Sequence, residues 1–199
     1  MRKALSLCLV SLALASRSVS PSNERSSSLE SSQFETSIPG SEESSSIVVV
    51  YFSATGHTKS VAEKIASHYS LSPIEIEPKD PYTAEDLNYS SPTSRTSKEN
   101  ADPSCRPEIA NSISLDSYST VFLGYPLWWG EAPKILYTFV ESQSFEGQQV
   151  YPFCTSASSP IGNSASHLAS NTGTWHEGKR FSIGTSQEEI NAYLTSLGF

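Results

Sequence analysis

Residues 47–58 of the 199-residue chain read IVVVYFSATGHT, and this stretch decides how the rest is interpreted. Its first five residues are branched aliphatic or aromatic and carry no charge, which is typical of a parallel strand covered on both faces. The run ends at small hydroxylated residues and a glycine, after which residues 59–69 have the apolar spacing of a helix. The turn therefore lies where a buried strand ends and a helix begins, and free N–H groups at that point favour an anion.

The turn has the composition of a neutral phosphate-binding loop. Ser53, Thr55 and Thr58 supply hydroxyl donors, and Gly56 permits a backbone conformation that a side chain would obstruct. The lysine of G-x-x-x-x-G-K-[ST] and the three glycines of G-x-G-x-x-G are missing, as are the Cys and Arg needed to cleave a phosphate ester. Such a loop suits a phosphate that is held and not transferred. The alternative is an ordinary strand-to-helix turn in which Ser and Thr cap the helix.

The first 46 residues differ in composition from the rest. Residues 1–15 combine two early basic residues with a short apolar run and an Ala-Leu-Ala pattern, which predicts a secretory signal peptide cleaved after Ala15. Residues 16–46 are rich in serine and poor in large apolar residues, so they are predicted to form a disordered tether. We expect residues 47–199 to be the folded domain of an exported protein, periplasmic or extracellular, with no stable membrane span after cleavage.

The net charge of −8 limits the partners of the chain. It excludes nucleic acid and anionic membrane surfaces, although N–H groups at contact range can still hold a single phosphate. Two cysteines lie outside the predicted signal peptide, and Cys154 ends an apolar strand, where a buried free thiol is typical. A disulfide with Cys105 is the alternative that export would allow. The sequence shows no spacing of metal ligands.

Strands and helices alternate along the predicted domain. Beyond the first strand, predicted strands cover residues 74–76, 119–125, 149–154 and 179–183, and predicted helices cover residues 59–69, 131–142, 164–170 and 186–197. This alternation predicts an α/β fold with a parallel sheet and helices on both faces. Ligands of such sheets bind beyond the carboxyl ends of the strands, where the winding order reverses. The polar segment 78–111 is predicted to be either disordered or a lid over a site.

Two further loops follow predicted strands at that edge of the sheet. The loop 126–130, PLWWG, carries Trp128 and Trp129, whose indoles are poorly placed to fill the core and are predicted to form a flat wall for a planar ring. The alternative is that one tryptophan packs on the neighbouring helix and the other lies on the surface. Residues 155–162 are rich in serine and are predicted to offer N–H and hydroxyl groups to the polar edge of the ring.

A phosphate and a planar heteroaromatic ring joined by a short polar chain describe flavin mononucleotide (FMN). FSATGHT after a buried strand resembles the phosphate loop of flavodoxins, and FLGYPLWWGEAP followed by VYPFCTS is similar to the flavin-ring loops of bacterial flavodoxin-like proteins. Residues 86–89 and 94–96 also resemble this subgroup. The resemblance covers about residues 47–199 and implies a three-layer sandwich with a five-stranded parallel sheet in the order 2-1-3-4-5.

The resemblance also implies which residues bind the cofactor. The implied phosphate contacts are Ser53, Thr55, Gly56, His57 and Thr58, and the implied flavin contacts are Pro126, Leu127, Trp128, Trp129 and Gly130, with polar support from Thr155, Ser156, Ala157 and Ser158. Two positions depart from the family pattern. His57 stands where Asn is usual, and the third loop reads TSASSPIG in place of a glycine-rich sequence, which predicts weaker FMN binding if that loop is too bulky.

These observations predict an exported FMN protein that acts in electron transfer or as an FMN-dependent oxidoreductase, with an unknown redox protein or small acceptor as its partner. An acidic domain with indoles against the ring disfavours the negative charge of reduced flavin, which predicts a midpoint potential below that of free FMN. The alternative is a flavodoxin-fold module that has lost FMN and serves as a binding or interaction protein. A hydrolase is disfavoured because the first loop has no nucleophile with a base beside it, and no catalytic residue is assigned.

Overall fold

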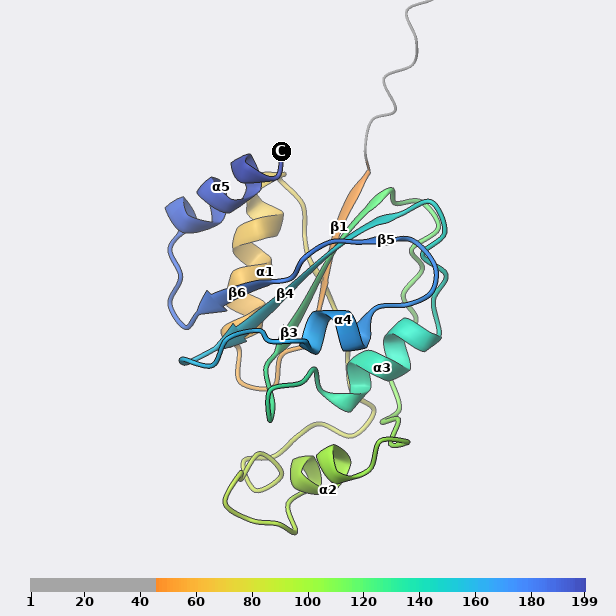
Figure 1. The fold of residues 1–199 in the computed structure, drawn as a ribbon, viewed down its shortest axis with the longest axis vertical. Helices are drawn as coiled ribbons and strands as arrows, with labels where there is room; N and C mark the ends of the chain where they lie inside the picture. Colours follow the sequence, from red (N-terminus) through yellow and green to blue (C-terminus); the bar gives the residue numbers. More distant parts are fainter. Residues whose placement is uncertain (1–45) are drawn as a thin grey trace, which may run out of the picture. The chain divides into compact units, whose positions relative to one another are not determined.

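The computed structural model of the protein describes residues 46–199 (Figure 1). The predicted signal peptide lies outside the described residues, as does the predicted tether apart from Ser46, so both stay predictions. Within the described part, no helix has the length and apolar character that a membrane span requires.

A parallel β-sheet forms the centre of the fold. The strands are β1 (Ile47–Tyr51), β2 (Ile74–Glu75), β3 (Thr120–Pro126), β4 (Gln149–Ser156), β5 (Thr174–Trp175) and β6 (Lys179–Ser182), and the helices are α1 (His57–His68), α2 (Arg95–Ala101), α3 (Lys134–Glu141), α4 (Ser164–Leu168) and α5 (Gln187–Ser196). The strand order is β2-β1-β3-β4-β5, β6 also pairs with β4, and every pairing is parallel. The predicted order 2-1-3-4-5 is therefore confirmed.

The last edge of the sheet consists of two short strands where the sequence predicted one. Strand β5 pairs with the start of β4 and β6 with its end. Pro152 lies between these two stretches of β4. Its nitrogen faces the same edge as the Val150 carbonyl, which accepts the N–H of His176 at 2.9 Å. Because proline has no N–H to donate, the ladder is interrupted there, and the chain resumes pairing only after Gly178.

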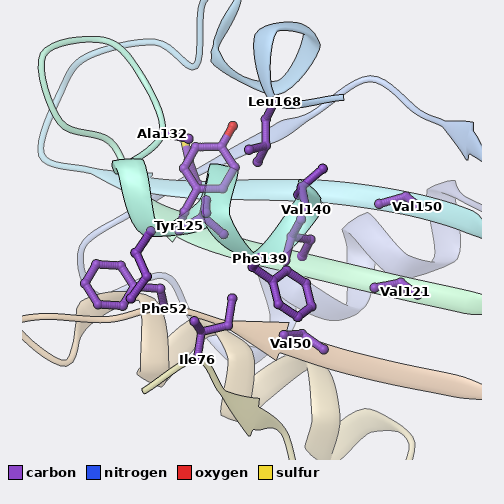
Figure 2. Close-up of a cluster of buried hydrophobic side chains, with 14 of the residues drawn as sticks. Val50, Phe52, Ile76, Val121, Tyr125, Ala132, Phe139, Val140, Val150 and Leu168 are labelled. Carbon is purple, nitrogen blue, oxygen red and sulfur yellow. The ribbon is translucent and has the colours of Figure 1, made fainter. Parts of the chain in front are cut away.

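Alternate residues of the strands point to opposite faces of the sheet. Val49, Tyr51, Phe122 and Phe153 pack with α1 and α5, whereas Val50, Val121 and Val150 pack with α3. Figure 1 shows α1 and α5 side by side on one face and α3 and α4 on the other. Figure 2 shows the second face, where side chains of α3 lie over those of three neighbouring strands. The predicted cover of both faces by helices is confirmed, and the uninterrupted apolar runs follow from it.

The opposite edge of the sheet is covered by the chain that leaves the polar segment. The Ala110 N–H donates to the Glu77 carbonyl at 2.8 Å, and Pro78 and Ile109 form an antiparallel bridge. The Asn111 side chain accepts the Glu77 N–H at 3.0 Å and donates to the Glu75 carbonyl at 2.8 Å. This amide therefore occupies the hydrogen-bonding groups that an edge strand exposes.

Candidate functional site

The carboxyl ends of the three central strands lie at one edge of the sheet. Tyr51 is level with Gly124, Gly124 with Phe153, and Pro126 with Thr155. Two contacts tie the following loops together: the Leu127 N–H donates to the Thr155 carbonyl at 3.0 Å, and the hydroxyls of Thr58 and Thr155 share a buried hydrogen bond of 2.8 Å. The predicted convergence of the three loops is therefore confirmed.

The first loop presents the uncapped start of α1. Gly56 precedes the helix with φ +85° in the left-handed region, and no side chain caps the first turn. The Gly56 N–H donates to Ser53 Oγ at 3.1 Å, which folds the loop back on itself. The first turn also carries no acidic residue. A left-handed turn followed by free helical N–H groups is an arrangement that can hold an anion.

The residues predicted to contact the phosphate differ in how far they are buried. Thr55, Gly56 and His57 are exposed, Ser53 is half-buried and Thr58 is buried. Because the Thr58 hydroxyl bonds Thr155, its role in the structure is to fasten α1 to β4. The backbone of the loop therefore faces outward, whereas only some of its hydroxyls do. Whether each residue contacts a phosphate stays a prediction.

The second loop is a tight hairpin turn that follows the end of β3. Trp128 and Glu131 exchange two backbone hydrogen bonds of 2.9 Å, with Trp129 at φ +51° and Gly130 at φ +80° between them. Two positive φ angles define a type I′ turn, whose first central position favours asparagine. A tryptophan there costs about 1–3 kcal/mol of backbone strain. The predicted helix over residues 131–142 consequently begins later, at α3 (Lys134–Glu141).

The two tryptophans of the hairpin have different environments. Trp128 is only 8 % exposed, and its ring packs edge-on against Phe52 and Tyr82, with centroids 5.7 Å and 5.3 Å apart. The prediction that neither indole fills the core is therefore wrong for Trp128. Trp129 is 38 % exposed and its ring lies 4.6 Å from that of Tyr89. Of the two indoles, Trp129 is the one that presents a free aromatic surface.

The polar segment 78–111 is folded and packs on the second loop through Tyr82 and Tyr89. It contains α2, from which the largely buried Glu99 accepts the Tyr82 hydroxyl at 2.9 Å and Arg95 Nε at 2.7 Å. The Arg95 guanidinium also lies 3.9 Å above the Tyr82 ring. Burial, together with the adjacent Glu99 carboxylate, raises the pKa of Tyr82 well above its usual range. The ion pair between Arg95 and Glu99, with the Tyr82 ring packed against it, holds the segment beside the site.

The third loop starts later than the sequence predicted, because Thr155 and Ser156 are the last residues of β4. Thr155 is buried, Ser156 is half-buried, and Ala157 and Ser158 are exposed. Sequence reasoning missed Arg180, which bonds this loop from β6, as it missed the contacts of Phe52, Tyr82 and Tyr89. The two tyrosines were visible only as aromatic residues in a polar segment.

The two cysteines of the described residues are not paired with each other. Cys105 and Cys154 are both free thiols, so the disulfide alternative is not realised. Burial raises the pKa of Cys154 to about 12, while the nearby Arg180 charge opposes this shift. The thiol is therefore protonated and unreactive at neutral pH. In residues 46–199 no cluster of side chains could hold a metal ion.

The residues at this edge fit a phosphate next to a planar ring. A side chain at Gly56 or Gly130 would meet no atom within 4 Å, so both glycines face open space. The uncapped helix start lies on one side of the edge and the exposed Trp129 ring on the next loop. Neutral hydroxyls and N–H groups can bind a phosphate that stays in place, and an indole can stack on a heteroaromatic ring.

Comparisons with known proteins agree with this geometry. A family model for flavodoxin matches residues 46–197. A Bacteroides uniformis protein proposed to be a flavoprotein is 38% identical with a TM-score of 0.72, over 76% of this chain and 98% of that chain. A similar protein of Bacteroides eggerthii is 40% identical with a TM-score of 0.73, over 78% and 99%.

A more distant structure shares the fold alone. The flavoprotein of Lactobacillus acidophilus in complex with FMN is 19% identical with a TM-score of 0.57, over 75% of this chain and 99% of that chain. Comparison with the curated proteins found no match. The family model and the two Bacteroides structures, with their sheet order and their loop positions, lead to one conclusion: this chain belongs to the flavodoxin family.

Proposed function

We propose that the chain binds FMN at the carboxyl edge of its sheet and acts in electron transfer, either as a carrier or as an FMN-dependent oxidoreductase. The observation that carries this proposal is the pairing of an uncapped helix start at Gly56 with the strained, exposed Trp129 on the adjoining loop. Strain and exposure of this kind lower stability, so a bound ligand is the physical reason for keeping them.

The phosphate of FMN would lie at the N-terminus of α1. The N–H groups of the first turn have no carbonyl of a preceding turn to bond, and the helix dipole adds partial positive charge there. The left-handed Gly56 directs the loop so that these donors converge. Because this site uses backbone groups, the absence of lysine and arginine from the loop does not prevent it from holding an anion.

The isoalloxazine ring would lie against Trp129, with Thr155, Ser156, Ala157 and Ser158 at its polar edge. Tyr89 already contacts Trp129 from the segment 78–111, so that segment would border the ring as well. An aromatic stack contributes about 0.5–1.5 kcal/mol beyond the area that it buries. The complex of the Lactobacillus acidophilus flavoprotein with FMN, which shares the fold, supports FMN as the ligand.

When bound, FMN would supply the redox chemistry, and the residues of the chain would bind it, orient it and limit access of water. Burial raises the pKa of Cys154, so its thiol holds its proton, and the Thr58 hydroxyl is bonded to Thr155; neither is assigned as a proton donor at the ring. A small acceptor or a redox protein would exchange electrons with the bound flavin.

The absorption spectrum of the purified protein tests the proposal. We expect a yellow protein with the near-UV and blue bands of oxidised flavin, and release of FMN on denaturation. Protein isolated without cofactor should regain these bands when FMN is added. A colourless protein whose fluorescence titration shows no FMN binding would contradict the proposal and favour an interaction module that has lost the cofactor.

Replacing Trp129 with asparagine separates stability from binding. Asparagine suits the first central position of a type I′ turn, so relief of about 1–2 kcal/mol of strain should exceed the lost Tyr89 contact of about 1 kcal/mol. We expect the FMN-free variant to unfold at higher urea concentration, while its affinity for FMN falls about tenfold. Trp129→Phe is the control, since it keeps both the strain and a ring. Unchanged FMN affinity in W129N would show that the indole does not contact the flavin.

We also propose that the protein is exported, on the basis of residues 1–15 and the serine-rich stretch that follows. Cleavage after Ala15 would leave a tethered domain outside the cytoplasm. N-terminal sequencing of protein recovered from its own cells would detect the cleavage, and an intact Met1 would contradict it.

A further inference from the structure

Arg180 on β6 holds the third loop through three hydrogen bonds. Its Nε donates to Ser156 Oγ at 3.0 Å, and its Nη2 donates to the carbonyls of Ser156 at 3.1 Å and Ala157 at 2.8 Å. Ser156 Oγ in turn donates to the Ser159 carbonyl, which closes the loop on itself. One guanidinium thus fixes the backbone at the point where the chain leaves the sheet.

The position of Arg180 is set by the sheet. Strand β6 pairs with the end of β4, where Cys154 is level with Arg180 and Ser156 with Ser182. The side chain is half-buried, so the contacts are not those of a fully solvated surface arginine. A fixed planar fork of donors that reaches two successive carbonyls orders a loop better than a single ammonium group does.

The charge of Arg180 is also not neutralised by a carboxylate. The ion pairs found among residues 46–199 involve other cations, and none includes Arg180. The acceptors of Arg180 are a hydroxyl and two carbonyls, which carry no net charge. In a chain of net charge −8, a positive charge therefore remains directly behind the third loop.

We propose that Arg180 is a positioning residue that orders the third loop for contact with the flavin and places a positive charge beside it that favours the reduced cofactor. This inference rests on the proposed FMN function. Two-electron reduction leaves the ring anionic, so a nearby cation binds reduced FMN more tightly than oxidised FMN. Arg180 thereby opposes the lowering of the midpoint potential that an acidic domain alone would cause.

Three variants separate the two roles of Arg180. Arg180→Met removes the charge and the hydrogen bonds, and Arg180→Lys keeps the charge but loses the planar fork. Lys179→Met is the matched control, because it removes one positive charge from the neighbouring position of β6, whose side chain lies over Tyr193 and not on the loop. Each variant is titrated with FMN and then reduced with dithionite against a dye of known potential.

For Arg180→Met we expect the dissociation constant of oxidised FMN to rise about tenfold. The dissociation constant of reduced FMN should rise by a further factor of about ten. That further factor lowers the two-electron midpoint by about 30 mV. Arg180→Lys should weaken FMN binding and keep the midpoint, and Lys179→Met should change neither. A midpoint in Arg180→Met equal to that of the unchanged protein, or an equal shift in Lys179→Met, would overturn the role of the charge.

Amide hydrogen exchange of the FMN-free protein tests the ordering of the loop independently of the cofactor. Residues 156–159 should exchange faster in Arg180→Met than in Lys179→Met, with the rest of β4 unchanged. Equal exchange in the two variants would overturn the positioning role. If the unchanged protein takes up no FMN, the proposed function fails, and the exchange result still decides whether Arg180 orders the loop.

Discussion

Replacing Gly56 with valine is expected to weaken FMN binding by roughly 100-fold. Gly56 has φ +85°, and a β-branched residue is strained in that region. Valine should move the backbone out of the left-handed conformation and turn the first N–H groups of α1 away from the phosphate. Loss of one or two charge-assisted hydrogen bonds, at about 1.5–3 kcal/mol each, corresponds to that drop in affinity. Isothermal titration of the cofactor-free protein with FMN measures it.

Gly147→Val is the matched control for this experiment. Gly147 also has a positive φ, +75°, and a side chain there likewise meets no atom within 4 Å. It lies just before β4, at the amino edge of the sheet and away from the three loops. Both variants should lose a similar amount of stability in urea. Equal loss of FMN affinity in both would show that strain alone, and not the phosphate site, explains the effect.

Replacing Gly124 with alanine should destabilise the whole domain by about 3 kcal/mol. A methyl group at Gly124 would lie 2.3 Å, 2.5 Å and 2.9 Å from three ring atoms of Phe153 on the neighbouring strand. Phe153 is fully buried, so its ring cannot move aside without disturbing the face covered by α1 and α5. Overpacking of a close-packed core costs about 1–3 kcal/mol. We expect the melting temperature to fall by roughly 10 °C.

A second substitution tests whether this clash is the cause. Phe153→Leu shortens the side chain that the new methyl group would meet, and alone it should cost about 1 kcal/mol. The double variant should be more stable than the sum of the two losses predicts, with a coupling of about 1–2 kcal/mol. Strictly additive losses would refute the proposed clash and indicate that Gly124 is needed for another reason.

The sequence was informative where one local rule decides the structure. Uninterrupted apolar runs such as residues 47–51 predict central parallel strands, and the glycine and small residues after them predict the turn before α1. That this turn binds an anion stays a prediction. The sheet order and the convergence of the loops follow from the family resemblance and from the alternation of strands and helices.

The predictions from sequence were wrong or incomplete where contacts between residues far apart in the chain determine the structure. Trp128 is buried against Phe52 and Tyr82, and Tyr82 belongs to a polar segment with no periodicity that would predict its fold. The break between β5 and β6 depends on which side of β4 Pro152 faces, which only the register reveals. Arg180 lies in the predicted strand 179–183, and nothing in the local sequence indicates that it contacts Ser156.

The side-chain amide of Asn111 affects how copies of the protein meet one another. It imitates a neighbouring strand and saturates the outermost backbone of the sheet, since β2 is only two residues long. A second copy therefore finds no free ladder to extend at the β2 edge, and extension of such a ladder is the first step of fibril growth. At this edge the sheet is protected from pairing with the same strand of another molecule.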